Sequence, residues 1–259
     1  MLDSVIIVLR ETLEASLLVS FLFVYSNIVR VRKLWMIWAI LIGSLISLLL
    51  AMNMSEISEW FDGAGQEILF VIVLISLAIL ILISNLLIIS STKKAIVNRW
   101  HMLLYSLIII IAMTMEGAEV IIYFESVFLN AERLSSNFWG GILGLGIGVS
   151  VGAVNYYFLA QLKQLSLTLC FVMLTLVSAG MVSQAISYLM QAGLVEDSYP
   201  VWDTSFLISE PSLLGQLLYA LIGYEATPTH NQVVFYFLFI VVPFCYLTYY
   251  KIKFHNEKN

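Results

Sequence analysis

The 259-residue chain is 61% hydrophobic and only 11% charged, with a formal net charge of −5. Soluble domains carry about 45–50% apolar and about 25% charged residues, so this composition excludes an ordinary globular protein in water. The excess of 17 acidic over 12 basic residues also argues against a nucleic-acid partner held by a basic patch. The composition therefore predicts a membrane protein, and its charge favours a cationic substrate.

Apolar runs of about 20 residues recur along the chain, each long enough to cross about 30 Å of hydrocarbon as a helix. Seven such spans are expected, at 4–28, 34–54, 67–90, 102–128, 138–160, 166–190 and 229–250. A further apolar stretch at 212–223 is too short to span and predicts a re-entrant or interfacial half-helix. Because no stretch is left over for a soluble domain, residues 1–259 are expected to form one all-α, polytopic membrane domain.

The basic residues predict the orientation, because cytoplasmic loops carry an excess of Lys and Arg. Ten of the 12 basic residues share one side of the predicted membrane, and Arg133 alone lies in the opposite loops. This rule places the N-terminus outside and the C-terminus in the cytoplasm, in a cell (inner) membrane. Most acidic loop residues fall on the outer side, where they either solvate the loops or form an anionic vestibule that concentrates a cation. The ten basic residues are Arg30, Arg32, Lys33, Lys93, Lys94, Arg99, Lys163, Lys251, Lys253 and Lys258.

Six charged residues remain inside the predicted spans, where an ionised group costs on the order of 2.5–3.5 kcal/mol and usually marks a pathway. They are Arg10, Glu11 and Glu14 in the first span and Glu116, Glu119 and Glu125 in the fourth. Glu11 with Glu14, and Glu116 with Glu119, form two E-x-x-E motifs, whose members share one helical face. Each of the two helices can therefore direct two carboxylates to one point.

The two motif-bearing spans are separated by three helices, so they cross the membrane in opposite directions. This spacing predicts two inverted three-helix repeats, at about 4–90 and about 102–190, related by an axis in the membrane plane. The half-helix and the last helix, at about 212–250, stand outside the repeats. On this interpretation the two E-x-x-E faces meet near the bilayer midplane.

Four carboxylates at one site are hard oxygen ligands that suit a hard cation. Because like charges disfavour one another's ionisation, some of these carboxyls are expected to hold protons when the site is empty. Arg10 either balances part of the negative charge or gates the site by competing with the cation. Glu125, nearer the outside, is either a ligand at the entrance or a residue that reaches solvent. A structural ion-pair network between two helices is the alternative interpretation of the whole cluster.

The segment Arg10-Glu11-Thr12-Leu13-Glu14 resembles a motif of the oxidase-dependent iron permeases, a family that includes fungal high-affinity and bacterial Efe-type permeases. The resemblance covers nearly the whole chain, and residues 223–229 are similar to that family's G-Y-x-x-x-P-[ST] turn. It implies seven transmembrane helices, an external N-terminus, and R-E-G-x-E motifs in helices one and four that bind and pass iron. Two positions depart from the pattern, because Thr12 stands where glycine is usual and Met115 replaces the second arginine. The implied iron ligands are Glu11, Glu14, Glu116 and Glu119, with Arg10 at the arginine position.

The resemblance implies an iron permease that passes Fe³⁺ or Fe²⁺ inward, with no cofactor beyond the transported ion and no enzymatic activity. Fungal members take iron from a ferroxidase and bacterial members work with periplasmic proteins, so a ferroxidase or an iron-delivery protein is an expected partner. The ion's oxidation state, the coupling, the oligomeric state and the effect of Met115 stay open. One alternative is a proton-coupled transporter of Mn, Zn or Pb. Another is an intramembrane polyprenyl-diphosphate phosphatase, although phosphoryl chemistry needs several cationic groups and the spans contain only Arg10.

Overall fold

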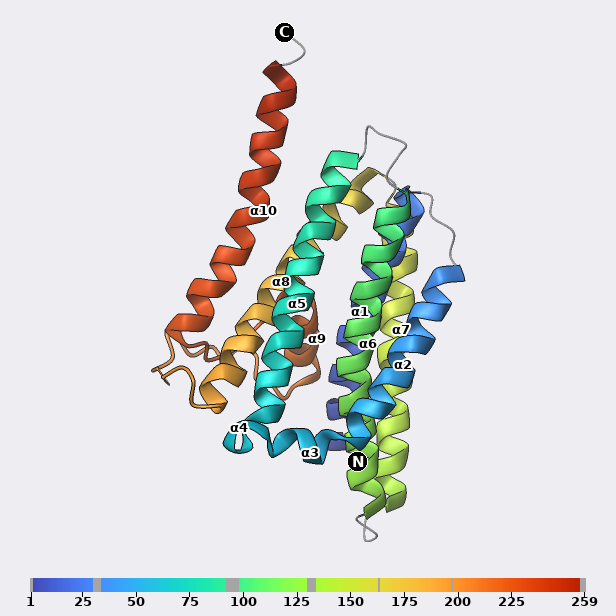
Figure 1. Cartoon of the computed structure of the whole chain (residues 1–259), viewed down its shortest axis with the longest axis vertical. Coiled ribbons are helices and arrows are strands. Elements are labelled where there is room, and N and C mark those ends of the chain that lie inside the picture. The colour runs from blue at the N-terminus through green and yellow to red at the C-terminus, as the bar shows by residue number, and fades with distance from the viewer. Residues whose placement is uncertain are drawn as a thin grey trace.

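The computed structural model describes residues 2–29, 34–91, 98–129, 134–162, 164–196 and 198–256, and these residues form a bundle of helices (Figure 1). The only β-type pairing recorded within those ranges is a single bridge between Pro200 and Thr229. The predicted all-helical architecture is therefore confirmed. The helices are α1 (Leu2–Val29), α2 (Leu34–Met52), α3 (Met54–Ser58), α4 (Trp60–Gly63), α5 (Gly65–Ser91), α6 (Asn98–Leu129), α7 (Leu134–Gln161), α8 (Gln164–Gln191), α9 (Leu213–Ile222) and α10 (His230–Asn256).

Six described helices are long and apolar enough to cross a membrane, namely α2, α5, α6, α7, α8 and α10. They coincide with six of the seven spans expected from the sequence. Helix α1 has 28 residues, a length that would also suffice, but it is not among the six. Its charged residues are Asp3, Arg10, Glu11 and Glu14.

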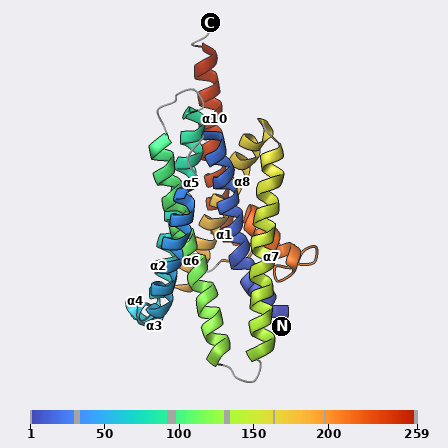
Figure 2. The same cartoon turned by 90° about the vertical axis from the view of Figure 1, so that its right-hand side faces the viewer.

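The long helices pack in pairs, with α1 against α7, α2 against α6 and α5 against α8 (Figure 2). Glycines on one face of α7 allow α1 to come close. A Cβ atom added at Gly144 would lie 2.5 Å from the Val5 carbonyl oxygen, and one added at Gly152 would lie 2.6 Å from Ser16 Cβ. Small residues at such a face let helix backbones approach, which is how helices associate in lipid.

A hydrophobic core lies between α1, α5, α6 and α8. At the same time, large apolar side chains such as Leu45, Leu143 and Phe237 are exposed on α2, α7 and α10. Helices that are apolar on both their inner and outer faces are typical of a protein surrounded by hydrocarbon. The fully buried core residues include Leu17, Leu18, Phe21 and Leu22 of α1, Leu74, Leu77 and Ile81 of α5, and Ile108, Ile109 and Ala112 of α6.

The connection between α2 and α5 is not a simple loop. It contains the short helices α3 and α4, and α4 turns sharply at Phe61, Asp62 and Gly63, whose φ angles are 53°, 60° and 97°. Three successive residues in the left-handed region reverse the chain within α4. The hydrophobic pattern of the sequence does not predict such a turn.

The expected half-helix is present as α9, which packs against α1 and α8. The Ser212 hydroxyl accepts a hydrogen bond from the Gly215 backbone N–H at 3.0 Å and caps its first turn. Gly223 ends the helix in the left-handed conformation, with φ 65°. The segment before α9 is tied to the turn after it, because the backbone N–H of Val201 donates to Pro228 O and that of Thr204 to Ala226 O, both at 2.9 Å.

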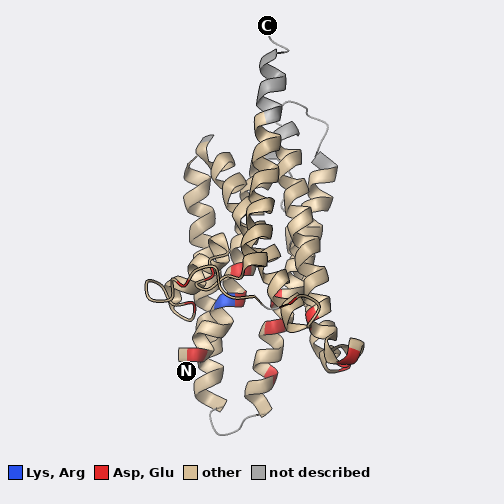
Figure 3. Cartoon of the chain, turned by 90° about the vertical axis from the view of Figure 1, so that its left-hand side faces the viewer, with Lys and Arg blue, Asp and Glu red and all other residues tan. Residues whose placement is uncertain are grey.

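Charge is distributed unevenly along the bundle. Figure 3 shows the described acidic residues in the half of the molecule away from the C-terminus, with a basic residue (blue) among them. The acidic residues thus gather toward one end of the bundle; that this end lies outside stays a prediction. The basic residues that predict the orientation lie outside the described side chains; they are Arg30, Arg32, Lys33, Lys93, Lys94, Arg99, Arg133, Lys163, Lys251, Lys253 and Lys258.

Candidate functional site

The two E-x-x-E motifs meet where α1 packs against α6. The two helices run in opposite directions (Figure 2). The carboxyls of Glu11 and Glu14 lie close enough to those of Glu116 and Glu119 for their charges to interact. Glu11 and Glu116 are 7% and 4% exposed, so the cluster is enclosed by protein. The four glutamates selected from the sequence therefore come together in the fold.

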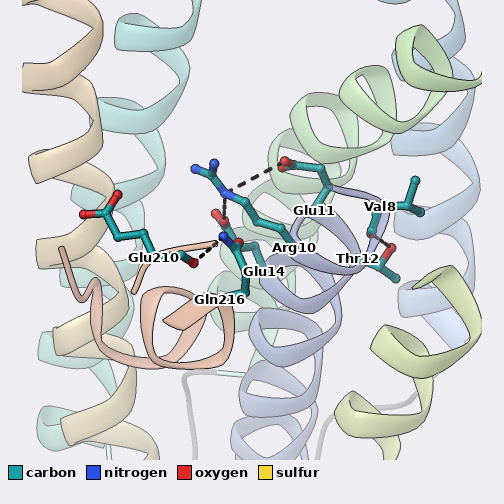
Figure 4. Close-up of polar contacts among 7 residues, drawn as sticks. All are labelled: Val8, Arg10, Glu11, Thr12, Glu14, Glu210 and Gln216. Atoms are coloured by element: carbon teal, nitrogen blue, oxygen red, sulfur yellow. Dashed lines mark hydrogen bonds and ion pairs between the residues drawn. The ribbon is translucent and has the colours of Figure 1, made fainter. Parts of the chain in front are cut away.

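Arg10 lies at the edge of this carboxylate cluster. Its Nε atom is 3.4 Å from Glu14 Oε1 and 3.9 Å from Glu11 Oε1 (Figure 4). Its guanidinium carbon lies 4.4 Å from the ring centroid of Tyr219 on α9, a cation–π contact. The Arg10 side chain is 34% exposed, whereas those of Glu11 and Glu14 are 10% and 9% exposed. Arg10 is thus positioned both to balance the carboxylates and to stand between them and more exposed space.

The four carboxylates lie near one another, but they are not arranged as a metal coordination shell. Within the part of the chain that the structure describes, no group of three or more His, Cys, Asp or Glu side chains is arranged to hold a metal ion. Glu119 Oε1 is buried and has no hydrogen-bond partner among the described atoms. Side chains that face one another in this way can reorient around an ion, since carboxylate oxygens bind hard cations in flexible geometry.

The remaining residues selected from the sequence lie at the margins of the cluster. Glu125, six residues after Glu119 on α6, is exposed. Met115, at the position of the second arginine, is 1% exposed and belongs to the apolar core. Thr12, at the usual glycine position, packs on Gly148 of α7, where an added Cβ would lie 2.7 Å from Thr12 Cβ.

A polar cavity of about 470 Å³ adjoins Arg10, and the sequence alone did not reveal it. Its walls come from α1, α8, α9, the segment before α9 and the start of α10. Among its lining residues Gln191, Glu210 and Thr227 are exposed, while Gln184 and Gln232 are buried. The complete lining is Arg10, Gln184, Ser187, Tyr188, Gln191, Glu210, Gln216, Tyr219, Glu225, Thr227 and Gln232.

Glu225, in the turn between α9 and α10, is held in this cavity by two donors. The Ser183 hydroxyl donates to Glu225 Oε1 at 3.1 Å, and Gln232 Nε2 donates to Glu225 Oε2. Burial raises the pKa of Glu225 to about 7, and the nearby Glu210 carboxylate adds to this effect. In the sequence, Glu225 occupies a variable position of the G-Y-x-x-x-P-[ST] turn, and the one signal that marks it is a carboxylate directly after a half-helix.

Glu210 joins the segment before α9 to the turn after it. Its Oε1 atom accepts the Ala226 backbone N–H at 2.7 Å. Its backbone carbonyl accepts a hydrogen bond from Gln216 Nε2 at 2.8 Å (Figure 4). These two bonds fix one wall of the cavity, so Glu210 has a structural role as well as a charge.

Comparison with known proteins identifies relatives that match nearly the whole chain. Ferrous iron permease EfeU of Yersinia pestis is 26% identical over 91% of this chain and 89% of its own length. Ferrous iron permease EfeU of Escherichia coli O6:H1 is 25% identical, with 91% of each chain covered. No solved structure shows significant similarity. A model of the iron permease FTR1 family matches residues 1–253, and the chain therefore belongs to that family.

Proposed function

We propose that this protein carries iron ions across the membrane, and that Glu11, Glu14, Glu116 and Glu119 are the carboxylates along which the ion passes. Membership of an iron permease family supports iron as the substrate. The observation that carries the assignment of residues is the enclosed meeting of the two E-x-x-E motifs, with Glu11 close enough to both members of the second motif for their charges to interact. Hard carboxylate oxygens are suitable ligands for an iron ion in either oxidation state.

The proposed route runs from the acidic face to the cytoplasm. The ion collects at the outer side, sheds water into the carboxylates of α1 and α6, and leaves on the side of the C-terminus. A membrane potential that is negative inside favours entry by about 2.3 kcal/mol per charge per 100 mV. Arg10 balances the negative charge of the carboxylates when no ion is present, and its side chain moves away from them when an ion arrives.

The proposed architecture has seven spans, with α1 as the span additional to the six identified by composition. Two inverted repeats, α1–α2–α5 and α6–α7–α8, are supported by the helix pairing. Exchanging the repeats converts the α1–α7 contact into the α6–α2 contact and leaves the α5–α8 contact unchanged. The proposed setting is a cell (inner) membrane with the N-terminus outside, and a ferroxidase or periplasmic delivery protein is the proposed partner.

The assignment is tested by removing one carboxylate from each motif. In cells that express the variants at the wild-type level, we expect Glu11→Ala and Glu116→Ala to abolish uptake of radioactive iron, because an ion that leaves water needs charged ligands in the membrane. Glu125→Ala, which removes an exposed carboxylate from the same helix α6, is the matched control and should retain uptake. Normal uptake by the first two variants would refute the assignment.

The oxidation state can be tested in proteoliposomes supplied separately with ferrous iron under anaerobic conditions and with chelated ferric iron. The relatives described above are named ferrous permeases, so ferrous iron is the first candidate. Recording internal pH in the same experiment shows whether protons move with the ion.

A proton-coupled transporter of another divalent metal is a second candidate, because the same oxygen ligands would accept it. Competition of manganese, zinc or lead against iron uptake distinguishes the two. A phosphatase is not supported, since Arg10 is the one Lys or Arg whose side chain the structure describes, and the family is one of permeases.

A further inference from the structure

The cavity beside Arg10 has the size and lining of a place for a cation that still carries its water. A water molecule takes about 30 Å³ of liquid volume, so an ion with six waters needs about 180 Å³. The cavity offers about 470 Å³. An ion can therefore enter it without losing its hydration shell, which a direct approach to the enclosed carboxylates would not allow.

The charged anchor of this cavity is Glu225, and its carboxylate is held by a network that reaches several elements. Gln232 Nε2 donates to Glu225 and, at 2.7 Å, to Ser187 Oγ. Gln232 Oε1 accepts from the backbone N–H of Thr229 at 2.7 Å and from its hydroxyl at 2.8 Å. Because every polar atom of the Gln232 side chain is engaged, the direction of Glu225 is fixed before any ion arrives.

A second observation, independent of Glu225, indicates that the cavity accommodates water or a hydrated ion. Gln216 Oε1 belongs to a lining residue, is buried, and has no hydrogen-bond partner among the described residues. A buried amide oxygen without a donor costs about 1–3 kcal/mol unless water or a hydrated ion occupies the space beside it. An acceptor of this kind can receive hydrogen bonds from the water molecules around a cation, whereas it cannot donate a hydrogen bond to an anion.

Arg10 separates this cavity from the deeper carboxylates. It lines the cavity, contacts Tyr219 of α9 and lies 3.4 Å from Glu14. We infer that the cavity is an antechamber in which Glu225 holds a hydrated metal cation before the ion passes Arg10 and sheds water at the α1–α6 carboxylates. The inference rests on the proposed function for the direction of movement, but occupancy of the antechamber can be measured without transport.

Binding of Tb³⁺, a hard cation whose luminescence is sensitised by nearby tyrosine, tests this site. Tyr188 and Tyr219 line the cavity and serve as donors of excitation. The protein is purified in detergent as a Glu11→Gln/Glu116→Gln variant, so that the deeper carboxylates no longer dominate binding. We expect sensitised Tb³⁺ emission, and we expect emission lifetimes in H₂O and D₂O to show that the ion keeps most of its water ligands.

Adding Glu225→Gln to that variant should weaken Tb³⁺ binding about tenfold, equivalent to about 1.4 kcal/mol. Glu196→Gln is the matched control, because it removes an exposed charge from the segment before α9 outside the cavity lining and should leave the affinity unchanged. The helical circular dichroism of each variant verifies folding.

Equal affinity with and without Glu225, or an ion stripped of most of its water, would overturn the inference. Intact iron uptake by Glu11→Gln or Glu116→Gln would instead refute the proposed transport site and leave the antechamber standing. The two failures are therefore distinguishable.

Discussion

Thr12 and Gly117 occupy the same position of the two E-x-x-E motifs, and each packs closely against another helix. A Cβ added at Gly117 of α6 would lie 2.8 Å from Ser47 Oγ of α2. On the other side, Thr12 of α1 faces Gly148 of α7. In the α6–α2 contact the motif residue is the glycine and Ser47 is the larger partner, whereas in the α1–α7 contact the motif residue Thr12 is larger and Gly148 is the glycine. This exchange gives a physical reason why threonine is accommodated at a position where glycine is usual.

This exchange predicts a compensating pair of substitutions. Gly148→Ala should destabilise the protein by about 1–3 kcal/mol, because the added methyl overlaps Thr12 in a well-packed contact. Combining it with Thr12→Gly should recover much of that loss. Thermal unfolding in detergent measures both effects. Gly146→Ala is the control, since an added Cβ there meets nothing within 4 Å; if the double variant is no more stable than Gly148→Ala alone, the complementarity is absent.

Glu225 predicts a pH dependence of cation capture. Its pKa of about 7 lies above the ordinary value of 4.5, so the carboxyl becomes protonated, and neutral, as pH falls through about 7. Arg10, Glu210 and Tyr219 are the other charged or titratable groups that act on it or lie nearby. The KM for ferrous iron should therefore rise between pH 8 and pH 6, and Glu225→Gln should reduce that rise. A variant with the wild-type pH profile of KM would contradict this role.

The sequence identified the four clustered glutamates because charge inside an apolar helix is costly and therefore conspicuous. Glu225 and Gln232 are not conspicuous in this way, since both stand beside a turn where polar residues are ordinary. Their significance comes from Ser183 and Ser187 on α8, about 40 residues earlier in the chain, with which they form hydrogen bonds. Contacts between segments so far apart leave no periodic signal.

At the scale of elements, α9 holds Arg10 in place through its contact with α8. Gly223, at the end of α9, lies so close to α8 that an added Cβ would be 2.4 Å from the Cα of Gly180. Tyr219, one turn earlier, carries the ring that Arg10 contacts. The position of the half-helix against α8 thus sets the position of the guanidinium.

Replacing Gly223 by alanine should displace α9. The substitution forces a side chain into the left-handed region, at about 1–2 kcal/mol, and also onto the α8 backbone, which cannot yield. We expect a lower unfolding temperature and reduced iron uptake. Gly193→Ala separates the two causes, because Gly193 has φ 70° but open space around it. Equal losses in both variants would show that the Gly180 contact is unimportant.

Six of the seven expected spans were predictable from length and hydropathy, and α9 was predictable from its shortness and the glycine that ends it. The α3–α4 corner was not, because its reversal depends on Phe61 and Asp62 adopting positive φ angles that such residues rarely take. The fold-back of residues 198–212 onto the turn after α9 depends on backbone bonds such as Thr204 to Ala226, which sequence patterns do not record.

At the scale of the whole molecule, the proposed orientation predicts which surfaces face the outside. In a Cys245→Ser background, where Cys170 is buried, Glu59→Cys should react with a membrane-impermeant maleimide on intact cells. Gln161→Cys, at the exposed end of α7, should react only after the membrane is permeabilised. The opposite pattern of labelling would invert the orientation.

The hydrophobic core described above also bears on how the ion moves. Along α1 the core includes Leu9 and Leu13, on either side of Glu11. It continues beyond Glu14 with Leu17, Leu18 and Phe21, which are fully buried in one cluster with Leu77 and Ile108 of neighbouring helices. An unpaired ion in such surroundings costs tens of kcal/mol by its loss of solvation. On the proposed orientation, the conformation described is therefore closed on the cytoplasmic side of the glutamates, and we expect each crossing to require that the helices part. Proteins that move in this way work as carriers with a turnover set by microsecond-to-millisecond rearrangement, and they saturate without passing a measurable single-channel current.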